Sequence, residues 1–180
     1  DRVGGGLQMG KRMRRRTGLT ALFWRYLLVT GGAVGVDAAV ALGAMSGGGP
    51  VVSVLPVALN SPYLSKNHFL RQSILEKGGA LLTEYFAQQT PGFGTFQVRN
   101  RLITGLACGV LLLQAARKSG TVMYASYAKD QNRDVFVWPG PQGDPAFAGG
   151  WDLLEDGAKA VERGEEILEE FQYRSAGRGK

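Results

Sequence analysis

The chain has 180 residues, 44% of them hydrophobic, and its 21 lysines and arginines outnumber its 15 aspartates and glutamates. This composition is sufficient for one domain with a buried core, and the net charge of +6 favours an anionic partner such as nucleic acid or phosphate. A single cysteine, Cys108, excludes a disulfide framework and favours a reduced cytoplasm. No apolar stretch is long enough to span a bilayer, so we expect no membrane span. Because the first residue is aspartate and not methionine, we expect the chain to begin mid-sequence.

Short apolar runs alternate with helix-length segments along the chain. Several runs are rich in Val and Leu and most end at Gly, Pro or polar residues, which is typical of buried strands. The predicted strands are Tyr26 to Thr30, Val51 to Val57, Ala80 to Tyr85, Gly109 to Gln114 and Asp134 to Trp138. The predicted helices are Lys11 to Arg25, Val36 to Met45, Lys66 to Lys77, Asn100 to Leu106, Val122 to Gln131, Gly150 to Gly157 and Glu165 to Phe171.

This alternation predicts an α/β fold in which parallel strands are joined by helical crossovers. The nearly continuous apolar strands indicate burial on both faces, so we expect an open, doubly wound, mostly parallel sheet with helices on both faces. We expect one domain over residues 1–172 and a disordered basic tail over 173–180. Ligands of such sheets bind beyond the carboxyl ends of the strands, where turns present free backbone amides.

The first candidate turn is "TGGAVGVDAA", which follows the first predicted strand. Gly31 and Gly32 allow a sharp turn and a close approach of backbone amides to a phosphate. The spacing is not the GxGxxG of dinucleotide sites, and no acidic residue is placed to hold a ribose, which argues against a nicotinamide enzyme. The alternative is a glycine-rich crossover without a ligand.

The second candidate turn is "AARKSGT", after the strand predicted to end at Gln114. Ser119, Gly120 and Thr121 begin the next helix, and Lys118 stands beside them, so the segment suits a second anion site on the same edge. It is not a Walker A loop, because the glycine follows the Lys-Ser pair. The alternative is an ordinary capped turn with solvated charges. We expect Arg117 to face solvent.

A third basic element, "FQVRNRLITGL", places Arg99 and Arg101 around Asn100, immediately before a predicted apolar helix. Arginine offers planar donors of fixed charge for phosphate, and asparagine can bind backbone or base edges. We expect at least one arginine to face a ligand, the alternative being an ion pair within the protein. The run "GKRMRRR" at residues 10–16 adds nonspecific attraction for a polyanion.

Residue sets for catalysis are sparse. His68 is the lone histidine and has no evident nucleophile beside it, while Glu84 is a carboxylate without an identifiable partner. No spacing of metal ligands occurs in the sequence. The sequence therefore offers no clear catalytic set, and we expect no cofactor.

Four collinear segments together resemble the DNA-processing protein A family (DprA, also called Smf). They are "VTGGAVGVDAAV", "GGALLTEYFAQQTPGFGTFQVRNRLITGL", "VLLLQAARKSGTVMYASYAKDQNRDVFVWPGPQGDP" and "LLEDGAKAV". The resemblance implies an extended Rossmann-like fold and a non-enzymatic cytoplasmic homodimer. It also implies a protein that binds and protects incoming single-stranded DNA and helps load the RecA recombinase in natural transformation. The DNA pocket implied by the resemblance comprises Gly31, Gly32, Arg99, Asn100, Arg101, Lys118, Ser119, Gly120 and Thr121.

The chain departs from the family pattern at basic positions. Where the family reads S-G-x-A-R-G-I-D, its arginine falls on Val34, and its V-G-S-R arginine falls on Gly6. The loss of two cations is expected to weaken DNA binding and to flatten its salt dependence, unless the run at 10–16 compensates.

Two other functions stay open from the sequence. One is a nucleotide sensor or nucleotide-processing enzyme of a related Rossmann-like family, such as the cytokinin-activating phosphoribohydrolases, although their P-G-G-x-G-T-x-x-E motif is incomplete here. The other is a structural paralogue that dimerises without binding DNA, which the replacements at Gly6 and Val34 would permit.

Overall fold

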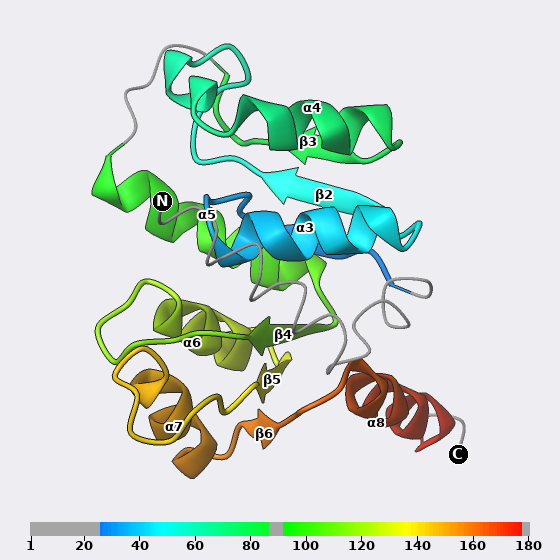
Figure 1. Cartoon of the computed structure of the whole chain (residues 1–180), viewed down its shortest axis with the longest axis vertical. Helices are drawn as coiled ribbons and strands as arrows, with labels where there is room; N and C mark the ends of the chain where they lie inside the picture. The colour runs from blue at the N-terminus through cyan, green and yellow to red at the C-terminus, as the bar shows by residue number, and fades with distance from the viewer. Residues whose placement is uncertain (1–25, 87–91, 178–180) are drawn as a thin grey trace.

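The computed structural model describes residues 26–86 and 92–177, in which strands and helices alternate (Figure 1). The strands are β1 (Leu28–Thr30), β2 (Val51–Val54), β3 (Ala80–Leu82), β4 (Gly109–Leu112), β5 (Asp134–Val137) and β6 (Lys159–Ala160). The helices are α3 (Val36–Ser46), η1 (Pro62–Ser65, a 3-10 helix), α4 (His68–Glu76), α5 (Phe93–Leu106), α6 (Val122–Asp130), α7 (Ala148–Glu155) and α8 (Gly164–Gly177). The predicted alternation is confirmed. The helix predicted over Lys11 to Arg25 and the basic run at 10–16 lie outside the described residues.

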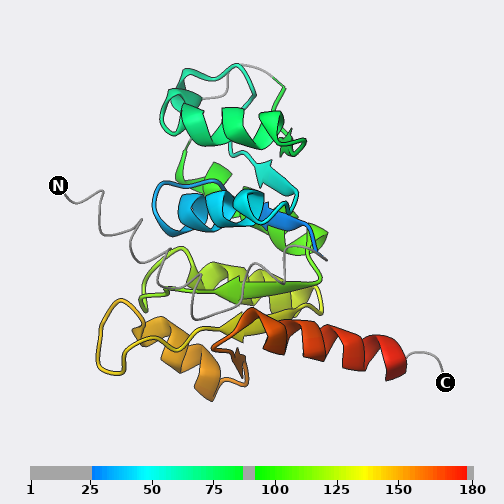
Figure 2. The same cartoon turned by 45° about the vertical axis from the view of Figure 1, so that its right-hand side comes forward.

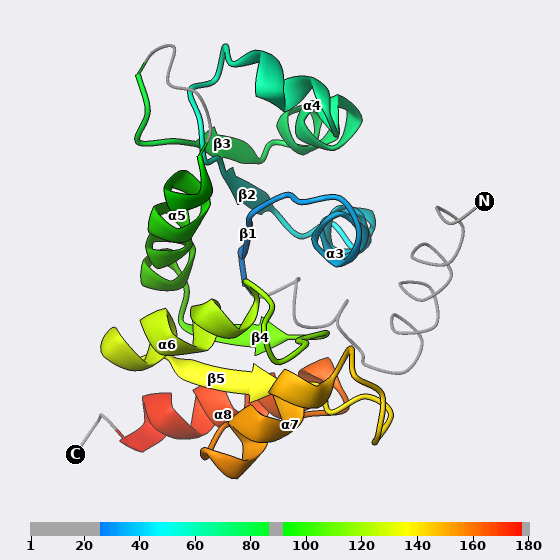
Figure 3. The same cartoon turned by 90° about the vertical axis from the view of Figure 1, so that its left-hand side faces the viewer.

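All described strand pairs are parallel, in the orders β1-β2-β3 and β4-β5-β6. Each half winds outward from its first strand, as expected of a doubly wound fold, and the two halves are hydrogen-bonded as separate three-stranded sheets. Helix α5 follows the first half and leads into β4 of the second (Figure 3). The predicted α/β, doubly wound architecture is therefore confirmed.

The two halves share one hydrophobic core. Buried side chains of α3, β2 and α4 pack in a single cluster with Leu113, with Phe136 of β5 and with Ile167 of α8. A second cluster lies between α6 and its neighbouring strands β4 and β5. This shared cluster joins the two halves, although their strands form separate ladders.

Helix α5 begins at Phe93, earlier than the start predicted at Asn100. The Thr95 hydroxyl accepts a hydrogen bond from the Gly92 amide at 3.3 Å and donates one to the Gly92 carbonyl at 2.8 Å, which caps the first turn. The Arg-Asn-Arg element therefore lies inside a helix and not ahead of one.

Helix α8 continues to Gly177, whereas the sequence predicted a helix only as far as Phe171. Phe171 packs against Tyr26 and Phe136 with ring centroids 5.2 and 5.7 Å apart, and this contact holds the helix to the body. The predicted disordered tail is thus helical over residues 173–177, while 178–180 lie outside the described residues. In Figure 2 the helix projects from the rest of the molecule. Among the described helices, none has the length and apolarity needed to cross a membrane.

Candidate nucleic-acid interface

The loops predicted to carry ligand contacts lie on one edge of the molecule. In Figure 1 the arrows of β2 and β4 point to the same side, and the β1–α3 and β4–α6 loops lie there with the N-terminal ends of α3 and α6. We call this side the carboxyl edge. Helix N-termini carry partial positive charge, so this edge favours anions even before side chains are considered.

Arg99 lies beneath the glycine turn of β1 and is only 6% exposed. Its Nη1 donates to the carbonyl oxygens of Gly31 at 3.0 Å and Val54 at 2.5 Å, and its Nε donates to Asn100 Oδ1 at 3.2 Å. A Cβ added at Gly31 would lie 2.8 Å from both Nη1 and Nη2 of Arg99. Glycine at 31 therefore makes room for the guanidinium, and Arg99 ties α5 to the ends of β1 and β2.

Gly32 takes up the left-handed conformation, with φ of 64°. Its amide donates to Thr30 Oγ1 at 3.2 Å, and its carbonyl accepts from Asn67 Nδ2 at 2.9 Å. A Cβ at this position would approach the Ser53 hydroxyl to 2.6 Å. The conformation of the turn is thus held by the protein's own contacts and does not require a ligand.

The charge of Arg99 is not balanced by an ion pair, since no carboxylate of the described residues lies within 4.0 Å of it. Its three hydrogen-bond acceptors are neutral oxygens. Tyr124, at the start of α6, lies close enough to feel both Arg99 and Asp37, and burial raises the pKa of its phenol to about 12. The phenol therefore stays neutral and leaves the positive charge of Arg99 in place.

Arg101 faces away from Arg99. Residues two positions apart on an α-helix differ in direction by about 200°, so one arginine points to the sheet and the other to solvent. Arg101 Nη2 contacts both carboxylate oxygens of Glu84, at 2.5 and 2.7 Å, with about half of each side chain exposed. For Arg101, the structure thus shows the alternative that the sequence left open, an ion pair within the protein.

The Lys118–Thr121 turn is accessible. Lys118 and Gly120 are exposed, and a Cβ at Gly120 would meet no atom within 4 Å. The amides of Gly120 and Thr121 donate to no described backbone or side-chain group, and the buried Ser119 hydroxyl likewise has no partner among these residues. This turn accordingly offers a cation and two free amides at the start of α6, as the sequence predicted.

Arg117 faces solvent, as expected, but its charge is paired with a carboxylate of the protein. Its Nε and Nη2 donate to the two carboxylate oxygens of Asp152 at 2.7 and 2.8 Å. Asp152 lies on α7, so the pair joins the β4–α6 loop to the helix that follows β5. The partner lies 35 residues away in the sequence, where no local pattern points to it.

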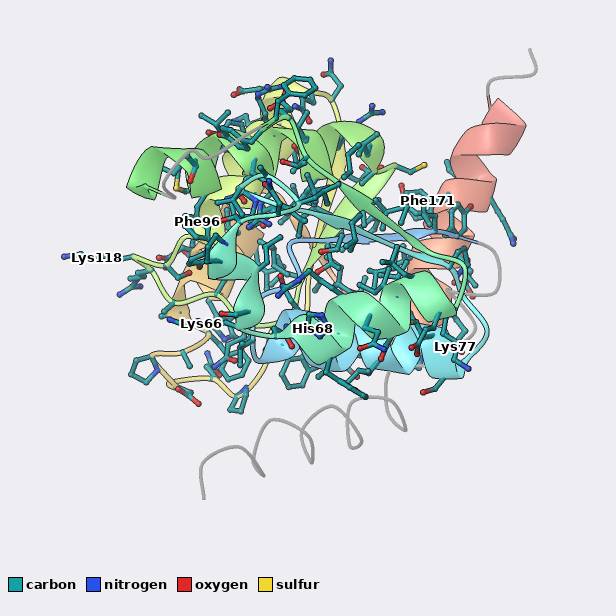
Figure 4. All side chains as sticks on the ribbon, turned by 90° about the horizontal axis from the view of Figure 1, so that it is seen from above. Lys66, His68, Lys77, Phe96, Lys118 and Phe171 are labelled. Carbon is teal, nitrogen blue, oxygen red and sulfur yellow. The ribbon has the colours of Figure 1, made fainter. Side chains whose placement is uncertain are left out.

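The sequence did not single out Lys66 or Tyr63 of the carboxyl edge. Lys66, ahead of α4, is exposed and has no carboxylate within 4.0 Å among the described residues. Tyr63 of η1 and Phe96 of α5 form an edge-to-face pair with ring centroids 5.7 Å apart, and Tyr63 is 39% exposed. In Figure 4, Lys66, Phe96 and Lys118 lie toward one side of the molecule, with Lys77 and Phe171 toward the other. The signal available in the sequence was "SPYLSKN", a proline-led turn carrying both an aromatic and a lysine.

Comparisons with known proteins find the family that the sequence motifs resemble. The family model for DNA recombination-mediator protein A matches residues 8–172. The chain is 38% identical to protein Smf of Escherichia coli, over 81% of this chain and 39% of that protein. It is 33% identical to the DNA processing protein DprA of Streptococcus pneumoniae, over 82% of this chain and 52% of that protein. The chain thus spans about half the length or less of these relatives.

Two solved structures are similar in fold. The X-ray structure of DprA from Streptococcus pneumoniae superposes with a TM-score of 0.80 at 30% identity, covering 92% of this chain and 56% of that chain. A structure of DNA processing protein A from Helicobacter pylori, described for its single-stranded DNA binding mode, gives 0.76 at 28% identity, covering 94% and 74%. Matched in sequence over most of its length and in fold over nearly all of it, this chain belongs to the DNA recombination-mediator protein A family.

Proposed function

We propose that the carboxyl edge binds single-stranded DNA through its phosphates, and that the chain belongs to a recombination mediator that protects incoming DNA and helps load RecA. The observation that carries the proposal is the buried guanidinium of Arg99, which has three neutral acceptors and no carboxylate within 4.0 Å among the described residues. A buried charge without a counter-ion is costly unless an anion approaches it. Its Nη2 makes no hydrogen bond to the described residues and is the atom we expect to face that anion.

The distribution of the remaining cations favours a polymer over a single nucleotide. Lys66 belongs to the segment between β2 and α4, whereas Lys118 belongs to the loop after β4, so the two lysines come from different halves of the fold. Figure 1 places these segments well apart along the same side. An extended chain of phosphates can reach both lysines and the free amides of Gly120 and Thr121, as single-strand binding grooves do.

The aromatic pair supplies a second type of contact. Tyr63 precedes Lys66 by three residues and packs against Phe96, which lies on the same side of the molecule as Lys66 (Figure 4). Base stacking on an aromatic ring contributes about 1–3 kcal/mol per base and tolerates any sequence. We expect the partly exposed Tyr63 ring to be the stacking surface, with Phe96 holding it in place.

A nucleotide-processing enzyme is less well supported. The carboxylates around the carboxyl edge are engaged within the protein, Asp152 by Arg117 and Asp37 by the Ala33 amide. Among the described residues of this edge, no carboxylate or histidine is paired with a nucleophile. We therefore propose a binding role without catalysis. The homodimer, the RecA contact and a cytoplasmic location follow from the family and are part of this proposal.

The proposal is tested by fluorescence anisotropy with labelled oligo(dT) over a range of salt concentrations. Lys118→Ala and Lys66→Ala should each weaken binding several-fold at low salt and reduce the slope of log affinity against log salt by about 0.7 per lost phosphate contact. Lys77→Ala is the matched control, because this exposed lysine lies on the other side of the molecule (Figure 4).

The comparison with Lys77 separates site binding from nonspecific attraction. If all three lysine variants lose affinity equally, the net positive charge and not the carboxyl edge holds the DNA. If the wild-type protein does not bind oligo(dT) at low salt, the proposed function is wrong. Release of free base from nucleoside monophosphates would favour the enzyme instead.

A further inference from the structure

Arg117 stands directly beside Lys118, yet its charge is engaged by the protein itself. Asp152 receives hydrogen bonds from Nε and Nη2, at 2.7 and 2.8 Å, while Nη1 donates to no described residue. We propose that Arg117 is a further phosphate ligand of the carboxyl edge, and that DNA recruits it by exchanging the Asp152 carboxylate for a phosphodiester. This inference rests on the proposed function.

The Arg117–Asp152 pair is easy to exchange. The side chains are 69% and 42% exposed, so water and salt screen their attraction, and pairs of this kind contribute little to stability. The guanidinium donates two parallel hydrogen bonds to a phosphate in the same geometry as to a carboxylate. Arginine at this position also holds the pKa of Asp152 below its usual range, so the competing carboxylate is ionised at neutral pH.

The loop that carries Arg117 is anchored without the ion pair. The Gly150 amide of α7 donates to the Ala115 carbonyl at 3.1 Å. Gly149 packs so closely on the loop that a Cβ there would lie 2.9 Å from the Ala116 carbonyl oxygen. Releasing the guanidinium therefore leaves the backbone of the Lys118–Thr121 turn in place, and only a flexible side chain has to move.

Location distinguishes this pair from the Arg101–Glu84 pair, which is also exposed. Arg101 projects from the outer face of α5, away from the buried Arg99. Arg117 is adjacent in sequence to Lys118 and close to the free amides of Gly120 and Thr121. When one phosphate of the DNA binds at this turn, we expect the next phosphate along the strand to lie within reach of Arg117.

Anisotropy titrations of the full chain with oligo(dT) test the exchange. Asp152→Asn keeps the size of the side chain and removes the competitor, so affinity should rise about three- to tenfold at low salt and the salt slope should steepen by up to about 0.7. Arg117→Ala should weaken binding and flatten the slope. In the Arg117→Ala, Asp152→Asn double variant, the gain from the asparagine should disappear, because Asp152 acts through Arg117.

Glu166→Gln is the matched control for charge. Glu166 also pairs with an exposed arginine, Arg163, and its substitution removes one negative charge, as Asp152→Asn does. Glu166 lies at the start of α8, which Figure 1 draws away from the β4–α6 loop. It should leave the affinity unchanged. Urea unfolding of each variant verifies that stability is retained.

Two results overturn the inference alone. One is wild-type binding that depends on Lys118 but is unaltered by Arg117→Ala and Asp152→Asn. The other is a gain from Asp152→Asn that persists in the double variant, since the carboxylate would then act by general repulsion of DNA. A wild type that fails to bind oligo(dT) at low salt overturns the proposed function and this inference together.

Discussion

The two glycine-containing turns of the carboxyl edge look alike in the sequence but differ in the structure. Gly31 and Gly32 are enclosed by Arg99, Ser53 and Asn67. Gly120, in contrast, has open space around it and an ordinary backbone conformation. The first turn is shaped by contacts beneath the surface, and the second is free to contact a partner. Glycine at a sheet edge therefore indicates close packing in one place and access to ligand in the other.

The largest expected effect comes from adding a methyl group at Gly32, whereas the matched substitution at Gly120 should have almost no effect. Gly32→Ala forces a side chain into the left-handed region and against Ser53 Oγ, so we expect the free energy of unfolding to fall by about 4 kcal/mol. Gly120→Ala should change it by less than about 0.5 kcal/mol. Urea unfolding measures both. Equal losses at the two positions would remove the distinction between the turns.

The two arginines of α5 extend the comparison. Arg99→Met removes the donor to the buried carbonyl of Val54 and the partly buried carbonyl of Gly31, and should destabilise the protein by about 3 kcal/mol. Arg101→Met breaks an exposed ion pair and should cost less than about 1 kcal/mol. The measurement is again urea unfolding. If Arg101→Met lowered the free energy of unfolding more than Arg99→Met, the structural role assigned to Arg99 would be wrong.

A smaller effect is expected at alkaline pH, from the phenol of Tyr124 in α6. Because the pKa of Tyr124 is raised to about 12 in the fold and is near 10.0 when unfolded, its stabilising contribution is complete below pH 10.0 and is lost as the pH rises toward 12. The loss should amount to about 2 kcal/mol, and Tyr124→Phe should abolish it. In Arg99→Met the phenolate absorbance should appear at still higher pH, because Arg99 favours the charged form. An unchanged titration in that variant would mean that Arg99 does not act on Tyr124.

The architecture was predictable because parallel strands buried on both faces leave long apolar runs. Alternation located β1 to β5 within a few residues, and it placed the candidate turns at the carboxyl ends of the strands. The two-residue β6 and the 3-10 helix η1 were missed, since such short elements have no periodicity to detect. The early start of α5 depends on one threonine bonded to one glycine, which outweighs the poor helix propensity of the segment.

The candidate site was harder to predict than the fold. Charged side chains are usually exposed, so no pattern in the sequence predicts that Arg99 is buried beneath a glycine. Its carbonyl partners lie 45 and 68 residues away along the chain. The carboxylates that engage Arg101 and Arg117 are equally remote, at separations of 17 and 35 residues. Lys118 was easier, because it sits beside a helix start and needs no distant partner to be understood.

The contacts that Arg99 and Asn67 make with the first turn also affect which substitutions this edge can tolerate. Val34, at the crest of that turn, is 79% exposed, and the hydrogen bonds described for the turn come from its neighbours. Substitutions at the crest can therefore alter what the surface attracts while the fold beneath stays intact. Such a separation between a fixed support and a variable surface makes this position a natural one for tuning affinity, by selection or by design.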